Sequence, residues 1–224
     1  MDDVFLKNCT LFAGLNAKEL RDDLSIVPQH IQCYEKDEII FHFMEQAETI
    51  GIILKGEVDS VKPFPNGKEV SVTARHPGDL IGPAAVFSVR HQYPCDLRAR
   101  KPTTLMMLHK EDILRLMQKD LRILENFTRE LATATYLLQE RLELLSYSGI
   151  AQKIAHYLLM QSRKKGTARI RIPESISHWA ALMNVSRPSL HRELHSMEMK
   201  GIVAYQAPFI SILDAEALER VLQK

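Results

Sequence analysis

A long segment without glycine or proline, residues 110–147, constrains the fold of this chain more than any other feature. The segment is dense in Leu, Glu, Gln and Arg, a composition that predicts helix along its length. Leucines recur in it every seven residues, at Leu124, Leu131, Leu138 and Leu145. A companion row, offset by three and four positions, holds Leu121, Thr128, Thr135 and Leu142. A seam of this kind predicts a partner helix, most simply the same helix of a second subunit.

The alternative for this seam is packing against the chain's own N-terminal part. Two threonines in one row weaken the seam, but a long helix between two domains has little else to bury it. We therefore expect the two rows to form the contact surface of a homodimer.

The length of 224 residues fits one large domain or two small ones, and we favour two. Hydrophobic residues make up 46% and charged residues 25% of the chain, values that exclude a disordered or low-complexity protein. Residues 1–146 hold 18 Lys and Arg against 22 Asp and Glu, whereas residues 147–224 hold 11 against 6. The basic C-terminal third is the part expected to meet a polyanion.

No stretch approaches the ~18 uninterrupted apolar residues of a membrane span. The N-terminus, Met1-Asp2-Asp3, is acidic where a secretory signal would be basic. These observations predict a soluble, cytoplasmic protein with no membrane partner. Cys9, Cys33 and Cys95 are odd in number and far apart, without the paired spacing of a zinc or redox site. We expect neither a metal nor a cofactor.

Residues 29–109 alternate strand-length apolar runs with turn residues, which predicts a β-rich domain after a short helix at 17–24. Runs rich in Ile, Val and Leu span residues 38–43, 50–54, 57–61, 69–73 and 104–108. Turns are expected at Lys55-Gly56, at 65–68 and at 76–79. Asn66-Gly67 is a strong signal for a tight hairpin, because that turn needs positive φ angles that Asn and Gly adopt at least cost.

The helical pattern is interrupted by the expected hinge, Ser146, Tyr147, Ser148 and Gly149. A second helix is expected at 150–163. Lys164-Lys165-Gly166 ends it, with cations near the helix C-terminus and Gly at the cap. A short strand is expected at 168–172.

Residues 175–200 fit two short helices joined by a tight turn. Ser175 or Ser177 can cap the first helix, and Asn184 supplies a left-handed residue at the turn. Ser186 can cap the second helix, whose first turn tolerates Pro188. The first helix has an inner face of Trp179, Ala180 and Met183.

On a helical wheel, the second helix turns Leu190, Leu194 and Met197 to one side. The expected DNA-contacting residues are those of its start and its other side: Ser186, Arg187, Pro188, Ser189, His191, Arg192 and His195. Arginines present forked donors that match guanine O6 and N7 or phosphate, and the serines could hold phosphate oxygens. We expect Arg187 and Arg192 to contact bases, with the two histidines as secondary contacts.

A β-hairpin wing follows, with strands expected at 202–205 and 209–213, and a helix that begins at Asp214 closes the unit. The alternative for any such pattern is an ordinary helical hairpin. The wing and the local positive charge favour a winged helix-turn-helix that binds DNA.

At these positions the sequence resembles the Crp/Fnr family of bacterial transcription regulators, over nearly the whole chain. Residues 78–82, Gly-Asp-Leu-Ile-Gly, with Ala85-Val86-Phe87 and Leu97-Arg98-Ala99 after them, resemble the family's effector-binding cassette. The spacing of Gly56, Gly67, Gly78 and Gly82 also matches. Residues 185–194, Val-Ser-Arg-Pro-Ser-Leu-His-Arg-Glu-Leu, resemble its recognition helix, with Gly201-Ile202-Val203 after it.

The resemblance implies an α+β fold of two domains. A β-roll of jelly-roll type, like a cyclic-nucleotide-binding domain, would span residues 1–117, a long dimerisation helix 118–147 and a winged helix-turn-helix 148–224. It also implies an allosteric homodimer that binds near-palindromic promoter DNA under the control of a small-molecule effector, with RNA polymerase as a further partner. The chain contains no GxSxG, P-loop, HExxH or paired-carboxylate motif, and we expect no enzymatic activity.

Cyclic-AMP-binding members carry a Glu for the ribose hydroxyls and an Arg-Ser pair for the cyclic phosphate. The matching positions here hold Pro83, Tyr93 and Pro94. Both charge-assisted contacts are lost, and Arg90 or Arg98 could replace the second only with a different geometry. We therefore expect an effector other than cyclic AMP. Three scattered cysteines argue against the iron–sulfur cluster of oxygen-sensing members, and His76 lacks a convincing second ligand for haem.

The expected effector pocket lies between the β-roll and the long helix. Its candidate residues are Val72, Ile81, Gly82, Pro83, Ala84, Ala85, Val86, Tyr93, Leu97, Arg98 and Thr135. Each apolar member is explained equally well as core. The competing function is a small-molecule sensor whose winged helix contacts protein instead of DNA, in which case Arg192→Ala would be silent.

Overall fold

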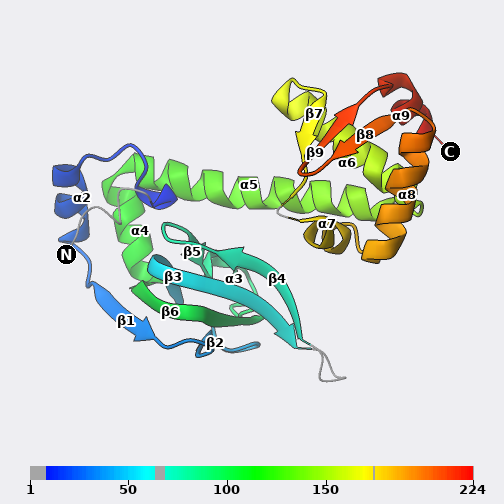
Figure 1. Cartoon of the computed structure of the whole chain (residues 1–224). Helices are drawn as coiled ribbons and strands as arrows, with labels where there is room; N and C mark the ends of the chain where they lie inside the picture. Colours follow the sequence, from blue (N-terminus) through cyan, green and yellow to red (C-terminus); the bar gives the residue numbers. More distant parts are fainter. Residues whose placement is uncertain (1–8, 64–68, 174, 224) are drawn as a thin grey trace. The chain divides into compact units, whose positions relative to one another are not determined.

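The computed structural model describes residues 9–63, 69–173 and 175–223 (Figure 1). The chain divides into two compact units, residues 1–134 and 135–224, each with its own hydrophobic core. The division falls inside one continuous helix, α5 (Leu121–Ser146). The mixed helix and sheet architecture predicted from the sequence is confirmed, with a β domain first and a helix-turn-helix domain second.

The first unit opens with η1 (Thr10–Phe12) and α2 (Ala17–Leu24), and the helix expected at 17–24 is confirmed. Asn16 caps α2, because its side chain accepts the N–H groups of Lys18 and Glu19. The Glu19 carboxylate accepts the Asn16 N–H at 2.8 Å in return. This reciprocal cap satisfies donors that a helix start leaves without partners.

Within the described residues, the sheet of the first unit has six strands, all paired antiparallel. They are β1 (His30–Tyr34), β2 (Ile39–Phe41), β3 (Thr49–Pro63), β4 (Glu69–Arg75), β5 (Leu80–Ile81) and β6 (Asp96–His109). The strand order is β1-β6-β3-β4, with β2 also on β6 and β5 also on β3. The short helix α3 (Pro83–Phe87) follows β5.

β3 is one strand where the sequence predicts two, so the turn expected at Lys55-Gly56 is wrong. The register of β3 against β6 shifts on both sides of Gly56, which has a φ of 104°. A Cβ at Gly56 would clash with the backbone and side chain of Thr103. The glycine therefore marks a β-bulge with a close backbone approach, and the strand continues through it.

Two further turns were expected, at residues 65–68 and 76–79. The Asn66-Gly67 hairpin lies outside the described residues, between the paired strands β3 and β4. The turn at 76–79 is confirmed: the His76 N–H donates to Asp79 Oδ2 at 2.8 Å, and Gly78 has a φ of 95°.

The segment predicted as one helix from 110 to 147 is two helices, α4 (Lys110–Lys119) and α5. Asp120 lies between them in an extended conformation. Its carboxylate accepts the backbone N–H of Arg122 at 2.8 Å and pairs with the guanidinium of Arg122 at 2.6 Å. A short acidic side chain that caps the following helix can end the preceding one without Gly or Pro.

The second unit contains the C-terminal turns of α5 and a small three-stranded sheet packed with helices. Its elements are α6 (Ile150–Lys165), β7 (Arg169–Arg171), α7 (Ile176–Leu182), α8 (Arg187–Met199), β8 (Val203–Gln206), β9 (Phe209–Ile212) and α9 (Ala215–Leu222). The strand order is β7-β9-β8, antiparallel. Gly166 ends α6 with a φ of 61°, as expected for a left-handed cap. No helix of the described residues is long and apolar enough to cross a membrane.

Candidate nucleic-acid interface and effector region

The helix-turn-helix is formed by α7 and α8, and the local signals that predict it are confirmed. Ser175 caps α7, since its Oγ accepts the His178 N–H at 3.1 Å. Asn184, in the turn, has a φ of 52°. Ser186 caps α8 by accepting the Ser189 N–H at 3.2 Å, and Pro188 lies in the first turn. These contacts fix where α8 begins and which way it points.

α8 has one buried side and one exposed side. Leu190, Leu194 and Met197 are at most 1% exposed and pack in the core of the second unit with Trp179 and Ala180 of α7. The residues expected to contact DNA lie at the start and on the outer side of the helix. Ser186, Arg187, Pro188, His191, Arg192 and His195 are exposed, and Ser189 is half-buried.

Hydroxyl groups orient the outer side of α8. The Oγ atoms of Ser186 and Ser189 are 2.8 Å apart, and Arg192 Nη2 donates to Ser189 Oγ at 3.3 Å. Because a hydroxyl is neutral, this bond positions the guanidinium without cancelling its charge. Arg192 can therefore still donate to a base edge or a phosphate.

The three-stranded sheet of the second unit adds two exposed cations that were not among the residues predicted to contact DNA. Arg169 and Arg171 of β7 are exposed on either side of the buried Ile170. The guanidinium of Arg169 lies 4.2 Å from the centre of the Phe209 ring, a cation–π contact with β9. The alternation Arg-Ile-Arg in a short strand is the signal that could have identified this pair, because alternate strand residues share a face.

α5 carries the two rows of the expected dimer seam. Leu121, Leu124, Leu138 and Leu142 are between 39% and 64% exposed in the single chain. Thr128 and Thr135 are exposed, while Leu131 and Leu145 are half-buried, and Leu131 packs against the core of the first unit. After Ser146, which ends α5, the expected hinge separates α5 from α6, and its Tyr147 ring lies 5.1 Å from His156.

The structure places five of the eleven candidate pocket residues in the core of the first unit. Those buried there are Ile81, Ala85, Val86, Tyr93 and Leu97. Gly82, Pro83 and Arg98 are half-buried, Ala84 and Thr135 are exposed, and the Val72 side chain lies outside the described set. Thr135 belongs to the second unit.

Tyr93 is packed directly against the cassette glycine. Its ring stacks on Phe41, its hydroxyl donates to Thr49 O at 2.6 Å, and only 2% of the residue is exposed. A Cβ on Gly82 would lie 3.0 Å from Tyr93 Cε1. Burial raises the pKa of the Tyr93 hydroxyl to about 12, so the group is neutral at physiological pH.

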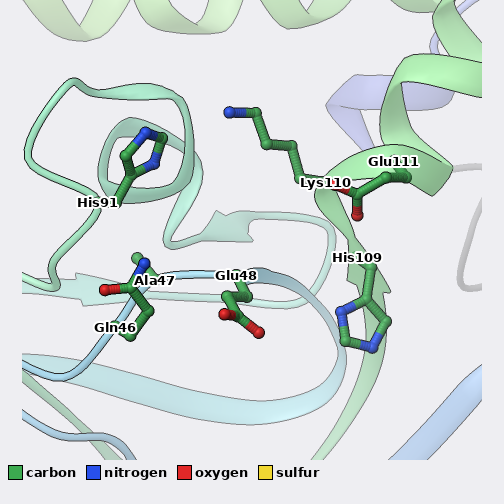
Figure 2. A pocket seen from close by; sticks show the side chains of 7 residues that line it. All are labelled: Gln46, Ala47, Glu48, His91, His109, Lys110 and Glu111. Carbon is green, nitrogen blue, oxygen red and sulfur yellow. The ribbon is translucent and has the colours of Figure 1, made fainter.

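A polar hollow opens elsewhere on the first unit, and Figure 2 shows the side chains around it. Its volume is about 360 Å³, and it is lined by Gln46, Ala47, Glu48, His91, His109, Lys110 and Glu111. Acidic, basic and amide groups therefore face one space. The ammonium of Lys110 also lies 5.5 Å from the centre of the Phe87 ring, which contacts Phe127 of α5 edge-on. None of the seven residues was predicted as part of the effector site.

Comparisons with known proteins agree with this architecture. A cyclic nucleotide-binding domain model matches residues 31–120, and a Crp-like helix-turn-helix domain model matches residues 152–221. The chain is 24% identical to the cyclic AMP receptor protein of Thermus thermophilus over 216 residues, which cover 96% of this chain and 98% of that protein.

Two solved structures show the same fold. The catabolite activator protein of Thermus thermophilus has a TM-score of 0.56 and 24% identity, covering 96% of this chain and 98% of its own. A CooA variant of Carboxydothermus hydrogenoformans has a TM-score of 0.59 and 14% identity, covering 86% of this chain and 87% of its own. Both domain models match in the expected order and together cover most of the sequence. The chain belongs to the Crp/Fnr family of transcription regulators.

Proposed function

We propose that this regulator is a homodimer that reads a near-palindromic DNA site and responds to a small-molecule effector other than cyclic AMP. The observation that carries the DNA-reading part is the two-sided α8. Its leucines hold it in the core, while Arg187, His191 and Arg192 are exposed on the side that can enter a major groove. We expect base contacts from Arg192 and Arg187, and phosphate or secondary contacts from Ser186, Ser189, His191 and His195.

The exposed leucines of α5 support the dimer. Leu121, Leu124, Leu138 and Leu142 fall on one stripe at heptad spacing, and a second α5 would cover them. Two-fold symmetry would place the two α8 helices about 34 to 36 Å apart, one turn of DNA, which requires two half-sites in inverted repeat.

Because several relatives are named for cyclic AMP, that nucleotide is the first effector to consider. The residues at three positions of this chain argue against it. Pro83 stands where cyclic-AMP-binding members carry the ribose-binding Glu, and Tyr93 and Pro94 stand where they carry the Arg-Ser pair. The buried, neutral Tyr93 ring cannot neutralise a phosphate.

Switching would follow from a population shift. An effector that changes the packing of α5 across the dimer would redirect the DNA-binding domains through residues 146–149. Carrying a 1:99 ratio of competent to incompetent states to 99:1 needs about 5.5 kcal/mol of differential binding. RNA polymerase is the partner through which a bound regulator would act on a promoter.

A selection from random DNA duplexes tests the proposal, with the wild type and Arg192→Ala each at two salt concentrations. We expect the wild type to enrich a sequence of two inverted half-sites, and the variant to lose or blur it. Binding should weaken steeply with salt in both proteins, because phosphate contacts release counterions. An Arg192→Ala protein that enriches the same site as the wild type would contradict the assignment of Arg192. A wild type with no affinity for duplex at low salt would contradict DNA binding itself.

A further inference from the structure

A lysine amine is buried behind the turn of the helix-turn-helix. Lys153 belongs to α6 and is only 8% exposed, and its Nζ donates to the backbone oxygen of Met183 at 3.0 Å. Burying an ammonium group costs free energy unless it is hydrogen-bonded. The carbonyl that it meets lies at the C-terminus of α7, where helices leave carbonyls without intrahelical partners and favour a nearby cation.

The Met183 carbonyl stands at the start of the turn that aims α8. Asn184 follows it in the left-handed conformation, and Ser186 then caps α8. Inside the motif, the Asn184 and Val185 N–H groups bond back to Ala181 and Ala180 of α7 at 3.1 and 3.0 Å. Lys153 holds the same turn from outside the motif, from a third helix.

The backbone of Lys153 is hydrogen-bonded to Gly149, the residue that precedes α6. Its N–H donates to Gly149 O at 3.1 Å, the first helical bond after residues 146–149. The Gly149 N–H is itself capped by Gln152 Oε1 at 3.1 Å. One residue therefore contacts the segment between α5 and α6 through its backbone and the recognition turn through its side chain.

We propose that Lys153 is a positioning residue for DNA recognition. Its ammonium fixes the turn between α7 and α8 against α6, so that Arg187 and Arg192 are presented in one orientation. The backbone bond from Lys153 to Gly149 also links that orientation to residues 146–149. A change in the packing of α5 would reach α7 and α8 through this segment. Lys153 contacts no DNA in this role, because its side chain is enclosed by the unit. The inference rests on the proposed DNA binding.

Three variants of the full-length protein test it. Lys153→Met keeps the length of the side chain and removes its donors, and Lys153→Arg keeps a cationic donor. Lys165→Met is the matched control, because it removes the same charge from the same helix at an exposed position. Fluorescence of Trp179, the single tryptophan of the chain, reports whether the second unit remains folded.

The first measurement needs no DNA. Amide hydrogen exchange should quicken at Asn184 and Val185 in Lys153→Met, while the amides of α6 and the emission of Trp179 stay as in the wild type. Lys153→Arg should restore the protection at least in part, and Lys165→Met should not alter it. Wild-type protection of these two amides in Lys153→Met would overturn the proposal.

The second measurement compares two duplexes, the one enriched by the wild type in the selection and a scrambled one of equal length. Lys153→Met should bind the enriched duplex about tenfold more weakly, equivalent to about 1.4 kcal/mol. Its affinity for the scrambled duplex should fall no more than that of Lys165→Met, because non-specific binding follows charge. Equal losses on both duplexes, or none, would overturn the positioning role. If the wild type bound neither duplex, DNA binding would fail, and hydrogen exchange would still decide whether Lys153 holds the turn.

Discussion

The rings of Tyr93 and Phe41 lie stacked, with centroids 4.2 Å apart and planes inclined by 6°. Together with the contact of Tyr93 with Gly82, this stack fills the space beside the cassette with the chain's own side chains. Tyr93 and Phe41 both belong to the hydrophobic core of the first unit. The free energy of unfolding of the first unit should therefore depend on whether the buried Tyr93 hydroxyl is protonated.

Raising the pH tests that dependence. The folded-state pKa of Tyr93 is raised to about 12 by burial, above the ordinary value of about 10, so its stabilising contribution is full below about pH 10 and is lost as the pH rises toward 12. At pH 8 the wild type should be more stable than Tyr93→Phe by about 1 kcal/mol, because the variant loses the hydrogen bond to Thr49. Urea unfolding should show this advantage shrinking between about pH 10 and pH 12. A difference that stays constant over that range would refute the assignment.

The dimer seam can be tested with two adjacent leucines of α5. Leu138 and Leu137 are 60% and 55% exposed, but only Leu138 belongs to the heptad rows. Leu138→Glu should shift the protein toward monomer by at least tenfold in dissociation constant, since it places like charges opposite each other across a two-fold axis. Leu137→Glu should leave the dimer unchanged. Sedimentation equilibrium measures both, and equal effects would mean that the seam is misassigned.

Gly56 and Gly166 provide a matched pair for backbone strain. Both have positive φ, at 104° and 61°, but a Cβ would meet Thr103 at the first and nothing within 4 Å at the second. Gly166→Ala should cost about 1 kcal/mol for the left-handed conformation alone. Gly56→Ala should cost at least about 2 kcal/mol more, because the bulge must move. Thermal unfolding of the two variants checks the difference, and equal losses would show that β3 relaxes freely around Gly56.

The exposed arginines of β7, Arg169 and Arg171, give a prediction about the salt dependence of DNA binding. If Arg171 neutralises a DNA phosphate, Arg171→Ala should weaken binding about equally to all sequences and reduce the slope of log affinity against log salt by about 1. Arg163→Ala is the control, because Arg163 is already paired with Glu219 at 3.2 Å. Fluorescence anisotropy over a salt series measures both slopes. A change of sequence preference in Arg171→Ala would instead place this residue against a base.

The helix-turn-helix could be predicted closely because its determinants are local. Asn184, Ser175 and Ser186 act within three residues of their partners, so composition and spacing suffice. Gly56 was misread because a glycine in a strand and a glycine in a turn look alike until the partner strand, with Thr103, is in place. β1 was not among the predicted strands, and four of its five residues are exposed.

The polar hollow had no signal in the sequence at all. Its lining comes from residues 46–48, 91 and 109–111, which are brought together by strand pairing and by the bonds of Met44 and Ala47 to Tyr93 and His91. No short motif records such an arrangement. The break at Asp120 could have been foreseen from its capping chemistry, but the strong helical composition on both sides concealed it.

Residues 132–139 of α5 are exposed on every side. A stretch of helix with so little burial depends largely on its intrinsic propensity, and Thr133, Thr135 and Tyr136 are poor helix formers. The Tyr136 ring does contact Lys164 of α6, whose ammonium lies 5.8 Å from the ring centre. In an isolated protomer this stretch should be the first part of α5 to unfold, and a second α5 would restore it. In the proposed homodimer, helix formation and subunit association would be a single equilibrium, so the helicity of this stretch would depend on the concentration of the protein in the cell.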